Sequence, residues 1–443
     1  MITLEAETLQ SRFWLDGTTE VVAAPGPGRL IEGGDAQRSR TLVAHRRQYG
    51  APQPAAVPSV AIGRLVAEAG LTGRGGAAFS TARKLAAVAE RGGWTVVANG
   101  TEGEPASRKD QLLMTLRPHL VLDGAMLAAA ATGAGSVVIC ISEDRPAALA
   151  SMTAAVAERA AFGEVPHARV VATPPRYVSG EETALVRWLN GGPAKPSAGR
   201  RRPFDRGVRN RPTLVQNVET LANLPLITRH GPGWYRSRGT QEEPGTRLVT
   251  VALGAGRLVV LEAACGASLS EVLTRAGVPT AEVQAVLVGG LYGTWLTGRS
   301  AAAAARLSRS GLMPFGASPG AGVLAPVPWD ACGLRETARI LTWYAGESAG
   351  QCGPCRFGLP ALAGVLGEVA AGRPRPGAME LIDHYSEDIE GRGGCRLPDG
   401  AVQLLRSARV VFADDFTRHL AGQSCRCRPE PQIGFRPNPA VGQ

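Results

Sequence analysis

The alternation of hydrophobic and polar positions divides the chain into regions with different periodicities. Apolar residues recur at helical spacing over 59–70. Three β-rich runs and one further helical run follow, at 94–100, 136–142, 167–174 and 145–163. Helices that alternate with β-rich runs are typical of a largely parallel sheet. The pattern therefore predicts an α/β domain over residues 56–240.

The pattern changes twice after residue 240. Short β-rich runs surround a single helical run between 245 and 325, which predicts a small α+β module over 241–328. Four amphipathic segments then follow, at 335–348, 359–372, 378–391 and 401–422. They predict a helical bundle over 329–424. The flanking residues predict an N-terminal extension over 1–55 and a Pro-rich tail over 425–443.

Composition and charge exclude some classes of function. The net charge of +10 is carried by an Arg-rich chain, but the densest basic stretch, 199–211, contains a single Phe. Binding of nucleic acid needs a basic face interleaved with stacking aromatic rings, so no nucleic-acid partner is expected. The first residues carry no secretory signal, and the longest apolar stretch, 126–141, is shorter than the roughly 20 residues of a membrane span. We expect a cytoplasmic protein, free or peripheral at the inner face of the membrane, with no direct membrane insertion.

The chain has eight cysteines, and in a cytoplasmic protein these are thiols or metal ligands before they are disulfides. Cys140, Cys265 and Cys332 stand singly and are interpreted as small buried residues. Cys352 and Cys355 form a C-x-x-C pair, and Cys395 follows in GGCRLPDG. A thioredoxin-like pair would need a strand before it, whereas here a helical region surrounds it, so a metal site is favoured over a disulfide.

Three polar segments carry candidate binding residues. A Gly-rich loop over 70–84 opens onto a helix that bears Lys84, which suits a phosphate group or a flavin edge, with a simple tight turn as the alternative. Acidic loops follow predicted strands at 98–110 and 177–185. Their carboxylates are either partners of helix N-termini or part of a ligand site, since α/β sheets bind ligands at the carboxyl ends of strands.

The segments GRGGAAFSTARK, NGTEGEP, YVSGEETAL, RPTLVQNVETLAN and ESAGQCGPCRFG occur in this order. In sequence and spacing they resemble the flavoprotein subunit of respiratory complex I, a subunit type also found in NAD-linked hydrogenases and formate dehydrogenases. The resemblance covers about residues 60–420. It implies a Rossmann-like domain that binds FMN and NADH, a β-grasp module of the soluble-ligand-binding type, and a four-helix bundle that carries a [4Fe–4S] cluster.

The resemblance also implies which residues bind the cofactors. The FMN residues would be Gly73, Gly75, Lys84, Asn99, Glu102, Gly180, Glu181, Gln216 and Asn217. The NADH residues would be Phe79, Glu104, Glu182, Arg201 and Phe204, with the two rings stacking on adenine. The chain departs from the family at Ala78, Ala87, Thr101, Arg201 and Gln216. NADPH is the alternative nucleotide, because the arginines at 200–202 offer bidentate contacts to a 2′-phosphate.

The cluster motif of the family has four cysteines, and this chain matches three of them. Cys352, Cys355 and Cys395 are present, while Ala349 replaces the first. Three outcomes follow from the residues: a [3Fe–4S] cluster, a [4Fe–4S] cluster with another ligand on one iron, or no cluster. The other candidate ligands are the oxygens of Ser348 and Asp399 and the thiols of Cys425 and Cys427. An unbroken helix over 399–421 would place the two thiols about 30 Å away.

The function implied by the resemblance is oxidation of NADH by FMN, followed by electron transfer through an iron–sulfur cluster to a partner protein. The partner would be a ferredoxin-like or complex I-like subunit. No side chain is expected to act as a catalytic acid or base, because the flavin supplies the chemistry. The alternative is a homologue without the cluster, acting as a direct flavin reductase or as a non-catalytic docking subunit.

Overall fold

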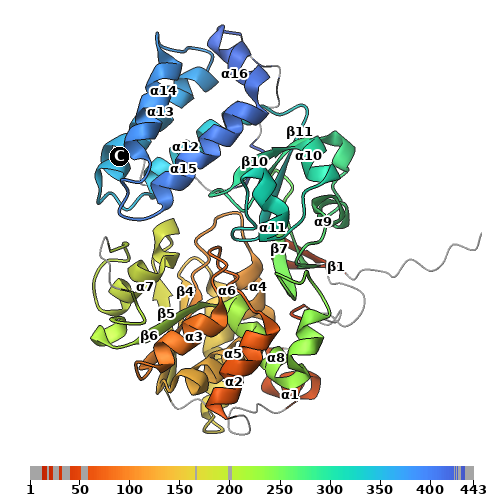
Figure 1. Ribbon diagram of the computed structural model, residues 1–443, viewed down its shortest axis with the longest axis vertical. Coiled ribbons are helices and arrows are strands. Elements are labelled where there is room, and N and C mark those ends of the chain that lie inside the picture. The colour runs from red at the N-terminus through yellow and green to blue at the C-terminus, as the bar shows by residue number, and fades with distance from the viewer. Residues whose placement is uncertain are drawn as a thin grey trace, which may run out of the picture.

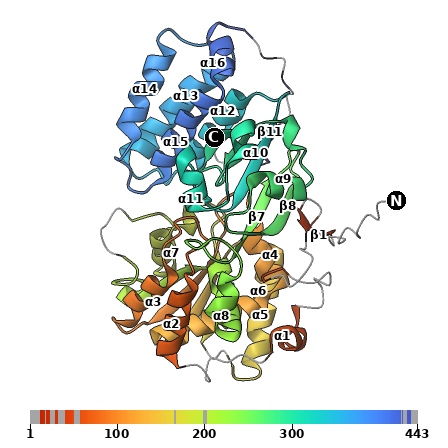
Figure 2. The same ribbon diagram turned by 45° about the vertical axis from the view of Figure 1, so that its right-hand side comes forward.

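The computed structural model describes residues 12–16, 19–22, 29–31, 40–50, 58–164, 167–197, 202–423, 425, 427 and 431–434. An α/β domain lies at one end of the molecule and a helical bundle at the other, with a β-rich module beside the junction between them (Figure 1). Figure 2 shows the same arrangement after rotation by 45°. The predicted fold class is confirmed.

The α/β domain is built on a four-stranded parallel sheet with the strand order β5-β4-β3-β6. Its strands are β3 (Thr95–Gly100), β4 (Ser136–Ser142), β5 (Ala168–Thr173) and β6 (Thr213–Asn217). The sequence analysis assigns the first three of these strands and misses β6. Only five residues long, β6 runs directly into a helix, so it shows no period of its own.

Helices cover both faces of this sheet. One face packs against α7 through Leu185 and Val186. The other face packs into the main hydrophobic core with the remaining helices. The helices are α2 (Ser59–Ala69), α3 (Thr81–Ala89), α4 (Lys109–Leu116), α5 (Pro118–Thr132), α6 (Pro146–Ala160), α7 (Glu182–Leu189) and α8 (Val218–Arg236). This arrangement leaves the carboxyl ends of β3, β5 and β6 to connect through loops.

The second module contains a seven-stranded mixed sheet with the order β1-β2-β8-β7-β11-β9-β10. Its strands are β1 (Arg12–Asp16), β2 (Thr19–Val22), β7 (Thr246–Ala252), β8 (Leu258–Ala264), β9 (Val283–Val288), β10 (Thr294–Thr297) and β11 (Val323–Pro328). Its helices are α9 (Leu269–Arg275), α10 (Gly298–Ala303) and α11 (Arg309–Leu312). The four runs predicted at 245–290 correspond to β7, β8, α9 and β9.

The predicted N-terminal extension is corrected by the structure, because parts of residues 1–55 belong to the folded domains. Strand β2 pairs in parallel with β8, and the backbone N–H groups of Leu30 and Ile31 donate to the buried carboxylate of Glu262. Helix α1 (Leu42–Tyr49) packs on α5 and α6. Strands of four or five residues are too short to show a period, and their partner is more than 200 residues away in the sequence.

The bundle consists of α12 (Gly333–Glu347), α13 (Leu359–Ala370), α14 (Ala378–Ile389), α15 (Leu397–Val411) and α16 (Ala413–Leu420). The single helix considered over 399–421 is broken at Phe412, which has φ −114° and ψ 33°. The Phe412 ring is buried and packs edge-on against Trp295 at 5.0 Å between centroids. This break turns α16 away from the direction of α15 (Figure 1).

Among the described helices, none is long and apolar enough by itself to cross a membrane. Helices α4 and α5 reach that length and hydropathy only together, and the chain bends by 98° between them.

Candidate functional site

Strands β3 and β6 end side by side with amide side chains. Asn99 and Asn217 are partners in the parallel register. Asn99 Nδ2 donates to the carbonyl of Gly180 at 2.8 Å, which ties the end of β3 to the loop after β5. Asn217 Oδ1 accepts from the N–H of Glu219 at 3.0 Å and caps α8. Three loops that are far apart in the sequence therefore converge at one edge of the sheet, as predicted from the strand order.

The Gly-rich loop folds onto this edge. Its ends are joined by the N–H of Gly73, which donates to the carbonyl of Phe79 at 2.8 Å. A Cβ added to Gly75 would lie 3.3 Å from the Cβ of Asn217, so glycine allows the loop to pack against the end of β6. Ala78, which stands where the family has glycine, adopts φ +50°. Gln216 Nε2 donates to Thr81 Oγ1 at 3.4 Å, at the start of α3.

Lys84 and Glu182 form an ion pair across this edge. Lys84 Nζ lies 3.1 Å from Glu182 Oε2, and both side chains are about one quarter exposed. The more exposed Arg202 reaches the other oxygen of Glu182 at 3.6 Å. A cation predicted for FMN and a carboxylate predicted for NADH thus lie together, on α3 and at the start of α7.

Two of the predicted acidic residues act as helix caps. The Glu102 carboxylate accepts from the N–H groups of Asp110 and Gln111, both at 2.9 Å. Glu181 accepts from the N–H groups of Thr183 and Ala184 at 2.9 and 3.0 Å. These bonds satisfy donors at the N-termini of α4 and α7 that have no partner within the helix. Stabilisation of helix N-termini therefore describes both carboxylates.

Glu104 is buried and points toward the β-rich module. Its carboxylate accepts from the N–H of Leu291 at 3.0 Å and from that of Ala106 at 3.4 Å. Burial raises the pKa of Glu104 to about 7, although the two backbone N–H groups favour the charged form. The residue therefore links the loop after β3 to the connection between β9 and β10.

The two predicted stacking rings lie near α3, and each has an arginine beside its face. Arg83 Cζ lies 5.5 Å from the centroid of Phe79, whose side chain is half exposed. Arg91 Cζ lies 5.0 Å from the centroid of Phe204, and Arg91 Nε also contacts Asp205 at 2.7 Å. The sequence analysis does not identify these arginines, although both belong to the segment STARKLAAVAER that carries Lys84. Arg201 lies outside the described residues.

A buried ion-pair cluster beneath the site is also absent from the sequence-based prediction. Lys109 Nζ lies 2.8 Å from Asp110 Oδ1 and 2.8 Å from Glu219 Oε2. Asp110 Oδ2 accepts from Asn217 Nδ2 at 2.8 Å, which connects the cluster to the end of β6. Burial raises the pKa of Asp110. The adjacent charges of Lys109 and Asp110 in SRKDQ are the sequence signal, but their pairing with Glu219 depends on the fold.

The three predicted cluster cysteines come together in loops of the bundle. Cys355 lies in the π-helical turn Pro354–Gly358 between α12 and α13, and Cys395 lies just before α15. Burial and the thiols of Cys352 and Cys395 raise the pKa of Cys355 to about 11. Burial opposes ionisation of Cys352, but hydrogen bonds from Gly394 and Cys355 outweigh it and lower the Cys352 pKa. The donor set fits an iron–sulfur cluster, which requires thiolates.

The candidates for a fourth ligand are placed differently. Ala349 is buried at the start of the cysteine loop. Ser348 Oγ donates to the carbonyl of Cys355 at 3.4 Å, and Asp399 Oδ1 accepts from the N–H of Gly391 at 2.9 Å. Cys425 lies instead beside Cys332 and His419, at the other end of α12. Since α16 turns at Phe412, the tail returns toward Cys332.

The cysteine loop is docked on the α/β domain. Glu347 Oε2 accepts from the N–H of Tyr177 at 2.9 Å and from Arg176 Nε at 3.2 Å. Gln351, next to Cys352, donates to the carbonyl of Pro196 at 2.8 Å and accepts from Arg187 at 3.0 Å. The loop that carries Glu181 therefore lies next to the loop that carries the first two cysteines.

Comparison with known families matches two parts of the chain. The Nuo51 FMN-binding domain matches residues 66–226, and the iron–sulfur-binding region of NADH-ubiquinone oxidoreductase-F matches residues 335–419. These matches cover the loops at the sheet edge and the cysteine loops. The chain therefore contains an FMN-binding domain and an iron–sulfur-binding region.

Relatives with known names support the same assignment. The second F subunit of NADH-quinone oxidoreductase from Rhizobium meliloti is 30% identical over 82% of this chain and 89% of its own length. The F subunit of the Streptomyces coelicolor enzyme is 28% identical, over 89% of this chain and 91% of its own length. A crystal structure of NAD⁺-reducing [NiFe]-hydrogenase superimposes with a TM-score of 0.77 at 28% identity, over 89% of this chain. The chain spans 66% of that hydrogenase chain. The predicted resemblance is confirmed: this chain belongs to the family of the F subunits of NADH-quinone oxidoreductase.

Proposed function

We propose that this protein oxidises NADH with a bound FMN and passes the electrons through an iron–sulfur cluster to a partner protein. The observation that carries the proposal is the docking of the cysteine loop on the acidic loop, through Glu347 and the N–H of Tyr177. This contact holds the predicted flavin site and the predicted cluster site next to each other. Short separation between redox groups is what single-electron transfer requires.

The FMN site is proposed at the carboxyl edge of the parallel sheet. The loop around Gly73 and Gly75 offers close backbone approach, and Lys84 offers a positive charge. Asn99, Gln216 and Asn217 offer amide groups at the ends of β3 and β6. When bound, FMN supplies the chemistry of accepting a hydride and releasing single electrons. The residues of this chain bind and orient it, and none needs to act as an acid or base.

The nicotinamide nucleotide is proposed to bind near α3. The adenine would stack on Phe79 and Phe204, and Arg83 and Arg91 already lie against these rings and can line the same site. NADH is favoured over NADPH because the Glu182 carboxylate would repel a 2′-phosphate. Arg202 contacts Glu182, so part of the positive charge in this segment is already paired.

The iron–sulfur cluster is proposed to have three cysteine ligands, Cys352, Cys355 and Cys395. A [3Fe–4S] cluster needs no fourth thiolate, and a [4Fe–4S] cluster would take an oxygen ligand on one iron. Ala349 itself offers no ligand atom. The receiving partner is proposed to be another electron-transfer protein, as expected for a subunit of a larger complex.

The test is electron paramagnetic resonance of anaerobically purified protein reconstituted with FMN, before and after addition of NADH. We expect the flavin absorbance to bleach on reduction. A cluster signal in the oxidised protein would identify three irons, and a signal only after reduction would identify four irons. Iron and sulfide near zero with flavin bleaching intact would contradict the cluster and leave the direct flavin reductase. Failure to bind FMN would leave the non-catalytic docking subunit.

A further inference from the structure

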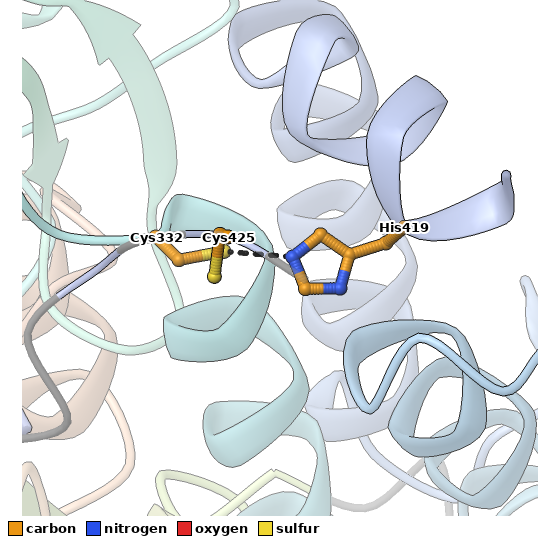
Figure 3. A group of neighbouring side chains, drawn as sticks. All are labelled: Cys332, His419 and Cys425. Atoms are coloured by element: carbon orange, nitrogen blue, oxygen red, sulfur yellow. Dashed lines mark hydrogen bonds between the residues drawn. The ribbon is translucent and has the colours of Figure 1, made fainter. Parts of the chain in front are cut away.

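A second group of potential metal ligands lies at the opposite end of α12 from the cluster cysteines. The ligand atoms of Cys332, His419 and Cys425 all lie within 4.8 Å of one another. Figure 3 shows the two thiols facing the imidazole. Cys332 and His419 are buried, and Cys425 is half-buried. Within the described residues, no other set of three Cys, His, Asp or Glu side chains is gathered this closely.

Each of these residues is held by a different part of the fold. Cys332 is the N-cap residue of α12 and follows the last strand of the β-rich module. The N–H of Gly333 donates to Asp415 Oδ2 at 3.0 Å, which fixes the first turn of α12 against α16. His419 lies on the last turn of α16 and reaches Cys332 because the chain breaks at Phe412. The tail then brings Cys425 to the same place.

The spacing of the ligand atoms matches tetrahedral zinc. Cys332 Sγ lies 3.6 Å from His419 Nε2. With Zn–S of about 2.3 Å and Zn–N of about 2.0–2.1 Å, tetrahedral geometry places the two atoms about 3.6 Å apart. A thiol donating to an imidazole gives a similar separation, so the distance alone permits both. The third ligand atom within the same radius is what a hydrogen-bonded pair does not require.

Cys427 can complete the set of four ligands. Burial and the neighbouring Cys425 thiol raise the pKa of Cys427 to about 11, which places the two side chains next to each other. Asp415 is the other nearby group, but one of its oxygens already accepts from Gly333. Sulfur and imidazole nitrogen select zinc over Mg²⁺ and Ca²⁺, which prefer oxygen ligands.

We propose that Cys332, His419, Cys425 and Cys427 bind one structural Zn²⁺ ion that fastens the C-terminal tail to the start of α12. A site with four protein ligands has no open position for a substrate, so its role is to stabilise the fold. The proposal does not depend on FMN or on the iron–sulfur cluster. The 15 residues of α12 separate the two metal sites by about 22 Å along its axis.

The contacts of the tail beyond this site show what the ion would fasten. The N–H of Gln432 donates to Glu336 Oε1 at 3.0 Å, and Ile433 is buried against the bundle core. A Cβ added to Gly434 would lie 2.9 Å from the Cα of Gly256, in the turn between β7 and β8. The tail therefore runs from the bundle to the β-rich module, and the zinc site anchors its beginning.

The experiment is metal analysis by mass spectrometry of the full chain, purified without chelator from a medium that contains zinc and iron. We expect about one zinc per chain in the unaltered protein, as for a four-ligand structural site. Cys332→Ser and Cys425→Ser should lose most of the zinc and keep their iron. Cys352→Ser should lose iron and keep zinc, which separates this proposal from the function proposed above. The matched control is Cys265→Ser, a buried cysteine of the β-rich module, which should change neither metal.

A second measurement guards against variants that fail to fold. Cys427→Ser alters a half-buried residue, and a chelator removes the ion from the unaltered chain. Both should lower the melting temperature, and added Zn²⁺ should restore it only in the unaltered chain, because the ion binds the folded state. Zinc absent even after incubation with Zn²⁺, iron in its place, or a disulfide among these cysteines would overturn the proposal.

Discussion

Lys84 Nζ and Glu182 Oε2 lie 3.1 Å apart, although the two residues are 98 positions apart in the sequence. Helix α3 presents the ammonium, and the first turn of α7 presents the carboxylate. The pair closes the edge of the sheet at the point where the Gly-rich loop and the loop after β5 meet. An anionic ligand arriving here meets a cation that is already held in position, and it can exchange one negative partner for another.

Replacement of Lys84 is expected to weaken FMN binding. A hydrogen bond to a charged group contributes about 1.5–3 kcal/mol, so Lys84→Met should raise the dissociation constant roughly 10- to 100-fold. Lys84→Arg keeps the charge and serves as the matched control. Flavin fluorescence titration measures both. Equal affinities in all three proteins would remove Lys84 from the proposed FMN site.

Replacement of Ala78 is expected to stabilise the fold. A non-glycine residue at φ +50° costs on the order of 1–3 kcal/mol, and glycine removes that cost while losing about 0.5–1 kcal/mol through the unfolded chain. Ala78→Gly should therefore raise the free energy of unfolding by about 1 kcal/mol. Ala77→Gly, at the neighbouring position without positive φ, should lower it. Urea denaturation of both variants checks the sign, and a decrease for Ala78→Gly would contradict the prediction.

The buried Glu104 predicts a pH dependence of stability. Its pKa is raised in the folded protein, from 4.5 to about 7, so the folded state favours the neutral form. The stability contributed by neutral Glu104 is complete below pH 4.5 and is lost as the pH rises through about 7. The advantage of the unaltered protein over Glu104→Gln should therefore fall by up to about 3 kcal/mol across this range. Denaturation at pH 5 and pH 8 tests it, and a constant difference between the two proteins would contradict it.

Ala349→Cys is expected to restore the fourth thiolate of the cluster site. The position is buried at the start of the cysteine loop, where the family has its first cysteine. Reduction with NADH should then produce the signal of a four-iron cluster with four thiolate ligands. Ala349→Ser is the matched control for size, and Cys395→Ser should lower the iron content. A spectrum unchanged from the unaltered protein would show that position 349 does not face the cluster.

The order of helices and strands was predictable because most of them are long enough to show their period. The pattern predicts β3, β4, β5, α6 and the four main helices of the bundle, and their positions agree with the structure. The motif residues likewise identify the family. The strands β1, β2, β6 and β10 are four or five residues long and show no readable period.

The sequence by itself determined which chemical groups this protein carries: the Gly-rich loop, the acidic loops, Lys84 and three cysteines of the cluster motif. The tertiary structure decided which of these groups meet. It pairs Lys84 with Glu182, directs Glu104 to Leu291, and brings Cys425 to Cys332 and His419. The physical reason is that each of these contacts joins loops or helix ends brought together by packing of separate elements, and local periodicity carries no information about such distant neighbours.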